Sequence, residues 1–225
     1  MSKRTPVKRD TYQKHGYMFL VGVPLFTICN IYLDTENYDL IRHSITKPYF
    51  KEKIRVRSYN TPNKESMVYL EIKKKVDGVV GKRRIGMTLS DFNNYLKNNK
   101  LIENENIQIK KELDYYFNLY SLYKKMYLSY DREAYYQKDN RDFRVTFDSN
   151  ITARSYNLEL DKGSYGEYIL SPDKCVMEVK TLGAMPIWFV KILNECNIMP
   201  CGYSKYGEAY TQLILKANTF EKCVV

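Results

Sequence analysis

The sequence predicts an α+β fold in which an antiparallel β-sheet closes into a barrel, with a helical insertion and flanking helices. Two observations support this class. Several segments alternate apolar and charged residues with the two-residue period of a β-strand. Between two groups of such segments, residues 89–125 change to the apolar spacing of a helix. The length of 225 residues suits a single domain, 1–225, with a sizeable buried core.

The first apolar segment, 16–29, follows a basic start and has the length and flanks of a secretory signal. It is too short to span a bilayer. Pro24 interrupts it, and no small-residue cleavage site follows it. The chain continues instead into FTICNIYLDT, which ends at Asp34. We therefore favour a buried core strand over 25–34, and a signal is the alternative.

The clearest strand is 50–59, in which every second residue from 51 to 57 is a cation. Successive side chains of a strand point to opposite faces, so these cations share one face while Ile54 and Val56 share the other. The four cations are Lys51, Lys53, Arg55 and Arg57. Further strands are expected over 67–76, 81–87, 126–135, 142–148 and 175–181, with a turn at 77–78.

Two regions have helical patterns. The insertion 89–125 follows Thr88 and contains Ser90, and both residues are suitable N-caps. The segment PIWFVKILNECNI, 186–198, predicts an amphipathic helix with Pro186 at its first position. We interpret the Tyr and Leu residues of the insertion as packing surface.

The charged strand faces predict how the sheet is arranged. If the apolar faces pack outward against helices, the charged faces turn toward one another and line the interior of a closed barrel. Cations gathered there repel one another unless a multiply charged anion and its metal neutralise them. A barrel of this kind therefore predicts an anionic ligand. An open sheet with a solvated charged face is the alternative.

Composition restricts the ligand without identifying it. The chain has 36 Lys and Arg against 26 Asp and Glu, a net charge of +10. This excess predicts a polyanionic partner, among which nucleic acid, nucleotide, polyphosphate and anionic lipid all qualify. The five cysteines form no CxxC pair and read as reduced cytosolic thiols. Two histidines provide no cluster for a transition metal, so carboxylate-bound Mg²⁺ or Mn²⁺ is the expected metal.

A series of motifs in order along the chain resembles a known family. The motifs are NIYLDT, EKIRVRSY, VYLEIKKK, GKRR, YDREAY, FRVTFD, VMEVK followed by P-x-W, and GYSKY. Together they resemble the polyphosphate polymerase domain of the vacuolar transporter chaperone family in its bacterial form, within the triphosphate tunnel metalloenzyme superfamily. The resemblance covers about Asn30 to Tyr206.

The resemblance implies an eight-stranded tunnel in which basic residues bind the triphosphate of ATP and a glutamate binds Mn²⁺ or Mg²⁺. Matched by motif, the implied phosphate-binding residues are Arg55, Arg57, Lys73, Lys82, Arg132, Arg144, Ser204 and Lys205. The implied catalytic residues among them are Arg55, Arg57, Lys73 and Lys205. Glu178 matches the metal ligand, and Lys180 is a weaker candidate for the tunnel interior.

The sequence departs from the family at its start. The family begins with a strand that carries a glutamate and a lysine in an E-x-K arrangement, whereas no glutamate precedes Glu36 here. The first strand of the family is therefore expected to be missing, through truncation or because the barrel closes with fewer strands.

Several charged residues have a simpler interpretation. Lys51 and Lys53 are expected on a solvated face or at the rim of the tunnel. Glu71 is expected to form a salt bridge to a neighbouring cation rather than a second metal contact. Asp148 is expected to cap a strand end, and Trp188 is expected in the core.

The resemblance implies a metal-dependent phosphotransferase: a polyphosphate polymerase that transfers the γ-phosphoryl group of ATP to a growing phosphate chain. The charged strand faces suit this chemistry, because phosphoryl transfer depends on positioning and on charge stabilisation. The alternatives are a triphosphatase or nucleotide cyclase of the same superfamily, and a non-catalytic module that binds polyphosphate or nucleic acid. The expected partners are ATP and polyphosphate or phosphate, without specific nucleic acid. A membrane partner for product translocation and the oligomeric state are left open. The expected location is the cytoplasm, including the inner face of the membrane.

Overall fold

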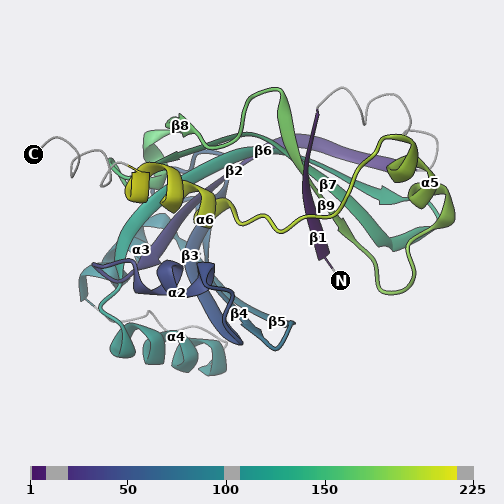
Figure 1. The fold of residues 1–225 in the computed structure, drawn as a ribbon. Helices are drawn as coiled ribbons and strands as arrows, with labels where there is room; N and C mark the ends of the chain where they lie inside the picture. Colours follow the sequence, from purple (N-terminus) through teal and green to yellow (C-terminus); the bar gives the residue numbers. More distant parts are fainter. Residues whose placement is uncertain (1, 9–19, 99–106, 217–225) are drawn as a thin grey trace, which may run out of the picture.

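The computed structural model describes residues 2–8, 20–98 and 107–216, and for 2–8 and Leu20 it describes the backbone alone. These residues form one antiparallel sheet in the order β1-β9-β7-β6-β2-β3-β4-β5, and β8 pairs with β7 beside this path (Figure 1). The strands are β1 Ser2–Lys8, β2 Leu20–Asp34, β3 Phe50–Tyr59, β4 Met67–Val76, β5 Val79–Thr88, β6 Tyr123–Gln137, β7 Asn140–Arg154, β8 Glu167–Tyr168 and β9 Lys174–Lys180.

Five α-helices accompany the sheet in the described ranges. They are α2 Asp39–Ile45, α3 Leu89–Asn98, α4 Ile107–Leu119, α5 Ile187–Glu195 and α6 Lys205–Tyr210. A 3-10 turn spans Leu160–Lys162, and a π-helical turn, Thr211–Leu215, continues α6. No helix within the described ranges is long and apolar enough to cross a membrane.

The α+β class with an antiparallel sheet is confirmed, but closure of the sheet into a barrel is not. The strands β1 and β5 lie at the two ends of the strand order and do not pair with each other in the described residues. The alternating pattern determines which side chains share a face, because the side-chain period of a strand is two. It does not determine whether the two edge strands of a curved sheet meet.

The start of the chain differs from the expectation that a first strand is missing. Ser2–Lys8 forms β1, which runs antiparallel to β9 with Arg4 opposite Glu178. The strand SKRTPVK contains no glutamate, so it lacks the E-x-K arrangement. Its sequence has no apolar alternation, which explains why strand patterning did not reveal it. The neighbouring strand β2 begins at Leu20, and residues 16–19 of the apolar segment lie outside the described ranges.

The apolar faces of the strands pack outward against helices, as predicted. Outward residues of β2 to β5, including Ile54 and Leu70, form a core with Phe92 of α3 and Leu113 of α4. Outward residues of β7 and β9 form a second core with Phe189 and Trp188 of α5, and Phe143 meets both aromatic rings. The expected insertion 89–125 corresponds to α3 and α4. Its end was placed too late, because β6 already begins at Tyr123.

The opposite side of the sheet, which we call the inner face, carries α6. Tyr206 of α6 stacks on Tyr32 of β2 with ring centroids 4.3 Å apart, and its hydroxyl donates to Asp34 Oδ2 at 2.9 Å. Asp34 also accepts the backbone N–H groups of Leu40 and Ile41 at 2.9 and 3.1 Å, which anchors the start of α2. One buried carboxylate at the end of β2 therefore positions both helices against the sheet.

Candidate functional site

Strand register gathers most of the predicted ligands on the inner face. Arg55 lies opposite Glu71, and Lys53 lies opposite Lys73. Lys73 in turn lies opposite Lys82. On the other half of the sheet, the charged inner-face residues are Arg132, Asp148, Arg144, Glu178 and Lys180, contributed by β6, β7 and β9. Lys205 reaches the same face from α6. The charged inner face predicted from the alternation is confirmed.

Glu71 binds the cations of β3 and β5. Its carboxylate is 1% exposed and lies 2.8 Å from Arg55 Nη2 and 2.6 Å from Lys82 Nζ. Arg55 Nε also donates to Oε2 at 2.9 Å, and Arg57 Nε lies 4.0 Å away. Burial raises the pKa of Glu71, but Arg55, Arg57 and Lys82 outweigh burial and lower this pKa to about 2. The predicted salt bridge of Glu71 is thus confirmed.

This lowered pKa predicts an acid-dependent loss of stability. A carboxyl group whose folded pKa lies below its ordinary value stabilises the fold above that ordinary value, here 4.5, and loses this contribution as the pH falls toward 2. We expect the free energy of unfolding to fall less steeply between these pH values in Glu71→Gln than in the wild type. Urea unfolding at a series of pH values measures this slope. Glu167→Gln, on the exposed strand β8, should follow the wild-type profile, and a Glu71→Gln profile parallel to the wild type would contradict the prediction.

Arg57 is more buried than Arg55 and is held by two hydrogen bonds. Its Nε donates to Asn30 Oδ1 at 3.0 Å and its Nη2 to Tyr130 Oη at 3.2 Å. Asn30 in turn donates to the backbone carbonyl of Leu128 at 3.1 Å. These bonds orient a nearly buried guanidinium, so its position is fixed before any ligand binds.

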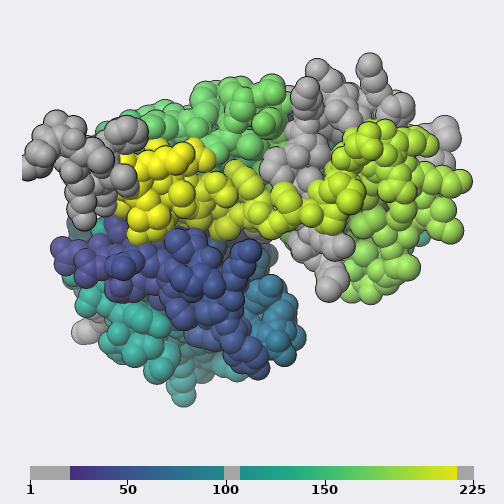
Figure 2. All heavy atoms as spheres, in the orientation of Figure 1, coloured from purple at the N-terminus to yellow at the C-terminus, as the bar shows by residue number. Residues whose placement is uncertain are grey.

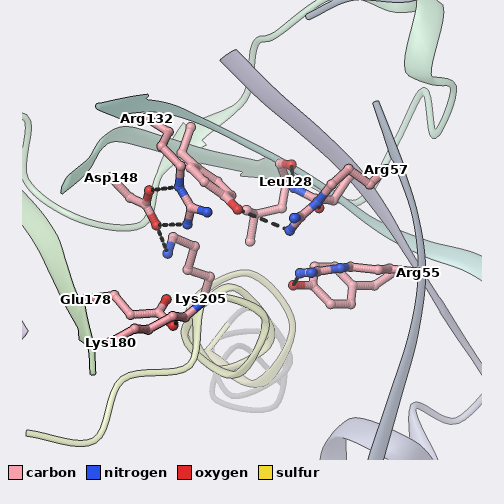
Figure 3. Close-up of polar contacts among 11 residues, drawn as sticks. Arg55, Arg57, Leu128, Arg132, Asp148, Glu178, Lys180 and Lys205 are labelled. Carbon is pink, nitrogen blue, oxygen red and sulfur yellow. Dashed lines mark hydrogen bonds and ion pairs between the residues drawn. The ribbon is translucent and has the colours of Figure 1, made fainter. Parts of the chain in front are cut away.

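A second charged group lies across the sheet from Arg57 (Figure 3). Asp148, which is fully buried, accepts from Arg132 Nε at 2.6 Å and from Arg132 Nη2 at 2.7 Å. Lys205 Nζ donates to the same carboxylate at 2.6 Å. Burial raises the pKa of Asp148, but Lys205 and Arg132 outweigh burial and the pKa lies below its ordinary value. The expectation that Asp148 caps a strand end is therefore wrong, because the residue lies within β7 and neutralises two cations.

Tyr130 joins the two charged groups and was not predicted as a site residue. Besides accepting from Arg57, its ring lies 4.6 Å from Lys205 Nζ and 5.3 Å from Arg132 Cζ. Burial raises the pKa of Tyr130, yet the three cations outweigh both burial and the opposing charge of Asp148, and the pKa lies below its ordinary value. Tyr130 thus lies among three cations, of which Asp148 directly pairs with two. Tyr130 shares the YDREAY motif and the strand face with Arg132, which is the signal that could have identified it.

Ser204 precedes α6 and links it to β3. Its hydroxyl accepts the backbone N–H of Gly207 at 3.1 Å, so it caps the helix. Lys53 Nζ donates to the same hydroxyl at 2.7 Å. Lys53 is therefore half-buried and bonded to the cap of α6 rather than fully solvated. Lys51, near the start of β3 opposite Lys75, lies further along the strand from Arg57.

The remaining candidates lie toward the β1 edge of the sheet. Arg144 is exposed and its Nε donates to the backbone carbonyl of Arg141 at 3.0 Å. Lys180 is also exposed, and its Nζ lies 3.6 Å from Glu178 Oε1. Glu178 itself is largely buried. The structure therefore gathers Arg55, Arg57, Lys82, Arg132 and Lys205 closely, and places Arg144 and Lys180 at the periphery.

The described inner face offers carboxylates that fit a metal bound together with a phosphate ligand. The described residues contain no group of three or more His, Cys, Asp or Glu side chains that could hold a metal. Glu71 and Asp148 are each bound by two cations, and Glu178 is a further, largely buried carboxylate on the inner face. Mg²⁺ and similar cations are commonly bound by one or two carboxylates plus substrate phosphates and water. Glu178 fits this kind of site.

Comparisons with known proteins agree with this fold. A model of the VTC domain matches residues 4–214. Among solved structures, a putative adenylate cyclase from Bacillus halodurans is similar, with a TM-score of 0.55 and 13% identity over 90% of this chain and 92% of that one. A putative adenylyl cyclase from Hippeastrum with a dominant triphosphatase activity has a TM-score of 0.53 and 14% identity, over 92% and 93% of the two chains. No curated protein sequence matches the chain.

Proposed function

Since this chain belongs to the VTC domain family, we propose that it is a polyphosphate polymerase that transfers the γ-phosphoryl group of ATP to a growing phosphate chain. The observation that carries this proposal is the cluster of three cations around Tyr130, where Arg57, Arg132 and Lys205 meet from three different elements. A buried site with excess positive charge is stabilised by a polyanion. Phosphate chains and nucleoside triphosphates supply that charge in a narrow, linear form.

The role proposed for each residue follows from the chemistry of its side chain. Guanidinium groups bind phosphate oxygens in pairs, so Arg55, Arg57 and Arg132 would orient the transferring group and stabilise its charge. The ammonium groups of Lys73, Lys82 and Lys205 would add positive charge that attracts the phosphate oxygens. Ser204 would act mainly by holding α6 and Lys205 in place. Arg144, which is exposed toward the β1 edge of the sheet, would contact phosphates of the polyphosphate chain that lie further from the transferring group.

The reaction requires little covalent chemistry from the protein. Phosphoryl transfer depends on placing donor and acceptor in line and on stabilising the charge of the transferring group. The acceptor of a polymerase is a phosphate that is already ionised, so no general base is needed. A divalent cation held by Glu178 and phosphate oxygens would supply further charge neutralisation at the transferring group.

Glu178 can be tested by removing its charge. We expect Glu178→Gln to raise the Mn²⁺ concentration needed for half-maximal activity about tenfold or more, because even residues that only support metal ligands have effects of this size. Metal-free binding of tripolyphosphate, measured by calorimetry with EDTA, should be retained or tighten, since one negative charge leaves the inner face. Glu167→Gln is the control. Unchanged metal dependence, or loss of metal-free binding, would contradict the assignment.

A second candidate function uses the same site with a different attacking group. Water would make the protein a triphosphatase, and a ribose hydroxyl would make it a nucleotide cyclase. The fold is similar to that of a putative adenylate cyclase and of a protein with triphosphatase activity. Both reactions are therefore alternatives that the assay must distinguish. A module that binds polyphosphate without catalysis is the remaining alternative.

One assay separates these functions. The purified protein is incubated with γ-labelled ATP and Mn²⁺ or Mg²⁺, and the products are sized on a gel and by chromatography. Labelled chains of increasing length support the polymerase. Free phosphate alone indicates a triphosphatase, labelled pyrophosphate together with a cyclic nucleotide indicates a cyclase, and unchanged ATP indicates a binding module.

A further inference from the structure

The tip of the β4–β5 hairpin and the chain entering β3 expose several large apolar side chains. Val79 is 74% exposed and Tyr49 is 70% exposed. The hairpin projects from the body of the protein beside β3, and Figure 2 shows this region at the rim of the molecule. We call these residues the apolar tip: Tyr49, Phe50, Val76, Val79 and Val80, all of which are exposed.

Strand register makes the apolar tip continuous. Phe50 lies opposite Val76, and Val76 lies opposite Val79, so three apolar side chains occupy one rung across β3, β4 and β5. Asp77 in the hairpin turn donates its backbone N–H to the carbonyl of Tyr49 at 3.0 Å, which holds Tyr49 beside the turn. Contiguous exposed apolar groups at a projecting end are typical of an interaction surface.

The apolar tip lies in strongly basic surroundings. Segments 45–51 and 74–83 contain six basic residues and one acidic residue, Asp77. Lys74 and Lys82 bind Glu112 and Glu71. The other three lysines near the tip, Lys47, Lys51 and Lys75, form no ion pair within the described ranges.

These lysines lie close enough to repel one another. Lys51 and Lys75 are opposite each other in the strand register. Burial lowers the pKa of Lys51, and the neighbouring charges of Lys75 and Lys47 lower this pKa further. The cluster would therefore be stabilised by negative charge from outside the protein.

We propose that the apolar tip docks on an anionic membrane surface, with Tyr49 and Val79 entering the headgroup region and Lys47, Lys51 and Lys75 binding lipid phosphates. Tyrosine favours the interface between bilayer and water, and basic residues near an anionic leaflet each add to the attraction. Nucleic acid would match the lysines but would leave the valines exposed. A second copy of the chain would cover the valines but would bring the two lysine clusters together. An anionic bilayer matches both features, and this inference does not depend on the proposed enzymatic activity.

The test is cosedimentation of the full chain with vesicles of phosphatidylcholine, with and without phosphatidylserine. We expect binding to the vesicles that contain phosphatidylserine, and we expect added salt to weaken it because the lysine contribution is screened. The double substitution Tyr49→Ser and Val79→Ser should reduce the affinity about tenfold or more, since both side chains lose their burial in the interface. Lys47→Glu should also weaken binding.

A control pair uses another exposed tyrosine and another exposed aliphatic residue elsewhere on the surface. Tyr156 and Leu182 are 55% and 85% exposed, and the double substitution Tyr156→Ser and Leu182→Ser should leave vesicle binding unchanged. The proposal is overturned by absence of binding to phosphatidylserine vesicles or by equal losses in both double variants. It is also overturned if sedimentation velocity shows that the apolar tip forms a dimer which Tyr49→Ser and Val79→Ser abolish.

Discussion

Replacing Arg55 with alanine is expected to lower turnover about 10²-fold or more. Under the proposed function, its guanidinium donates to the transferring phosphoryl group, and loss of one such preorganised donor has effects of this size. Arg55 suits this role because it is partly exposed and its position is fixed by Glu71 and by the Tyr32 hydroxyl 3.2 Å from Nη1. Single-turnover measurements with labelled ATP separate this loss from weaker binding.

Two further variants make the Arg55 result specific. Arg55→Lys keeps the charge but loses the paired donors, so it should recover only part of the turnover. Arg83→Ala removes an arginine from the outward side of β5, where it lies 3.8 Å from Glu112, and should retain activity. Equal turnover in the Arg55→Ala and Arg83→Ala proteins would contradict the assignment of the inner face as the reaction site.

Replacing Asp148 with alanine is expected to destabilise the protein by about 3–5 kcal/mol. The substitution leaves Arg132 and Lys205 without their shared carboxylate in a buried position, and removal of one member of a buried ion pair has costs of this order. Chemical unfolding measures the loss, with Asp139→Ala in the exposed β6–β7 turn as the control. An Asp148→Ala protein as stable as the control would contradict the prediction.

The same variant links stability to the proposed ligand. With Asp148 removed, Arg132 and Lys205 can both bind a polyanion, so tripolyphosphate should stabilise Asp148→Ala more than it stabilises the wild type. Lys205→Met in the Asp148→Ala background should recover part of the lost stability, because one unpaired charge is removed. Additive losses in the double variant would show that the two residues act independently.

The sequence predicted the inner face well because the period of a strand determines it. Alternate positions in 50–59 placed Arg55 and Arg57 on one face, and the structure confirms that face by register with β4 and β5. The outward core followed from the same pattern. Sheet closure did not follow, since it depends on the accumulated curvature of many strands.

The predictions that were wrong or missing concern residues whose role depends on partners far away in the sequence. Asp148 looked like the end of a short strand, but β7 continues to Arg154 and a lysine 57 positions later binds its carboxylate. Tyr130 was not predicted as a site residue, because its role depends on Arg57 and Lys205 from other elements. The helix α6 has only six residues, too few for a helical period to be visible in the sequence.

The docking of α6 has a consequence for biosynthesis. Its contacts close very long loops, since Tyr206 bonds to a residue 172 positions earlier and Ser204 to one 151 positions earlier. Domains fold as they leave the ribosome, and pairings of this separation form late. The nascent sheet therefore presents its arginines before Lys205 exists to complete the site. We expect a truncated chain that ends before residue 204 to have a folded sheet but little affinity for triphosphate, so that ligand binding begins only after α6 has been synthesised and has docked.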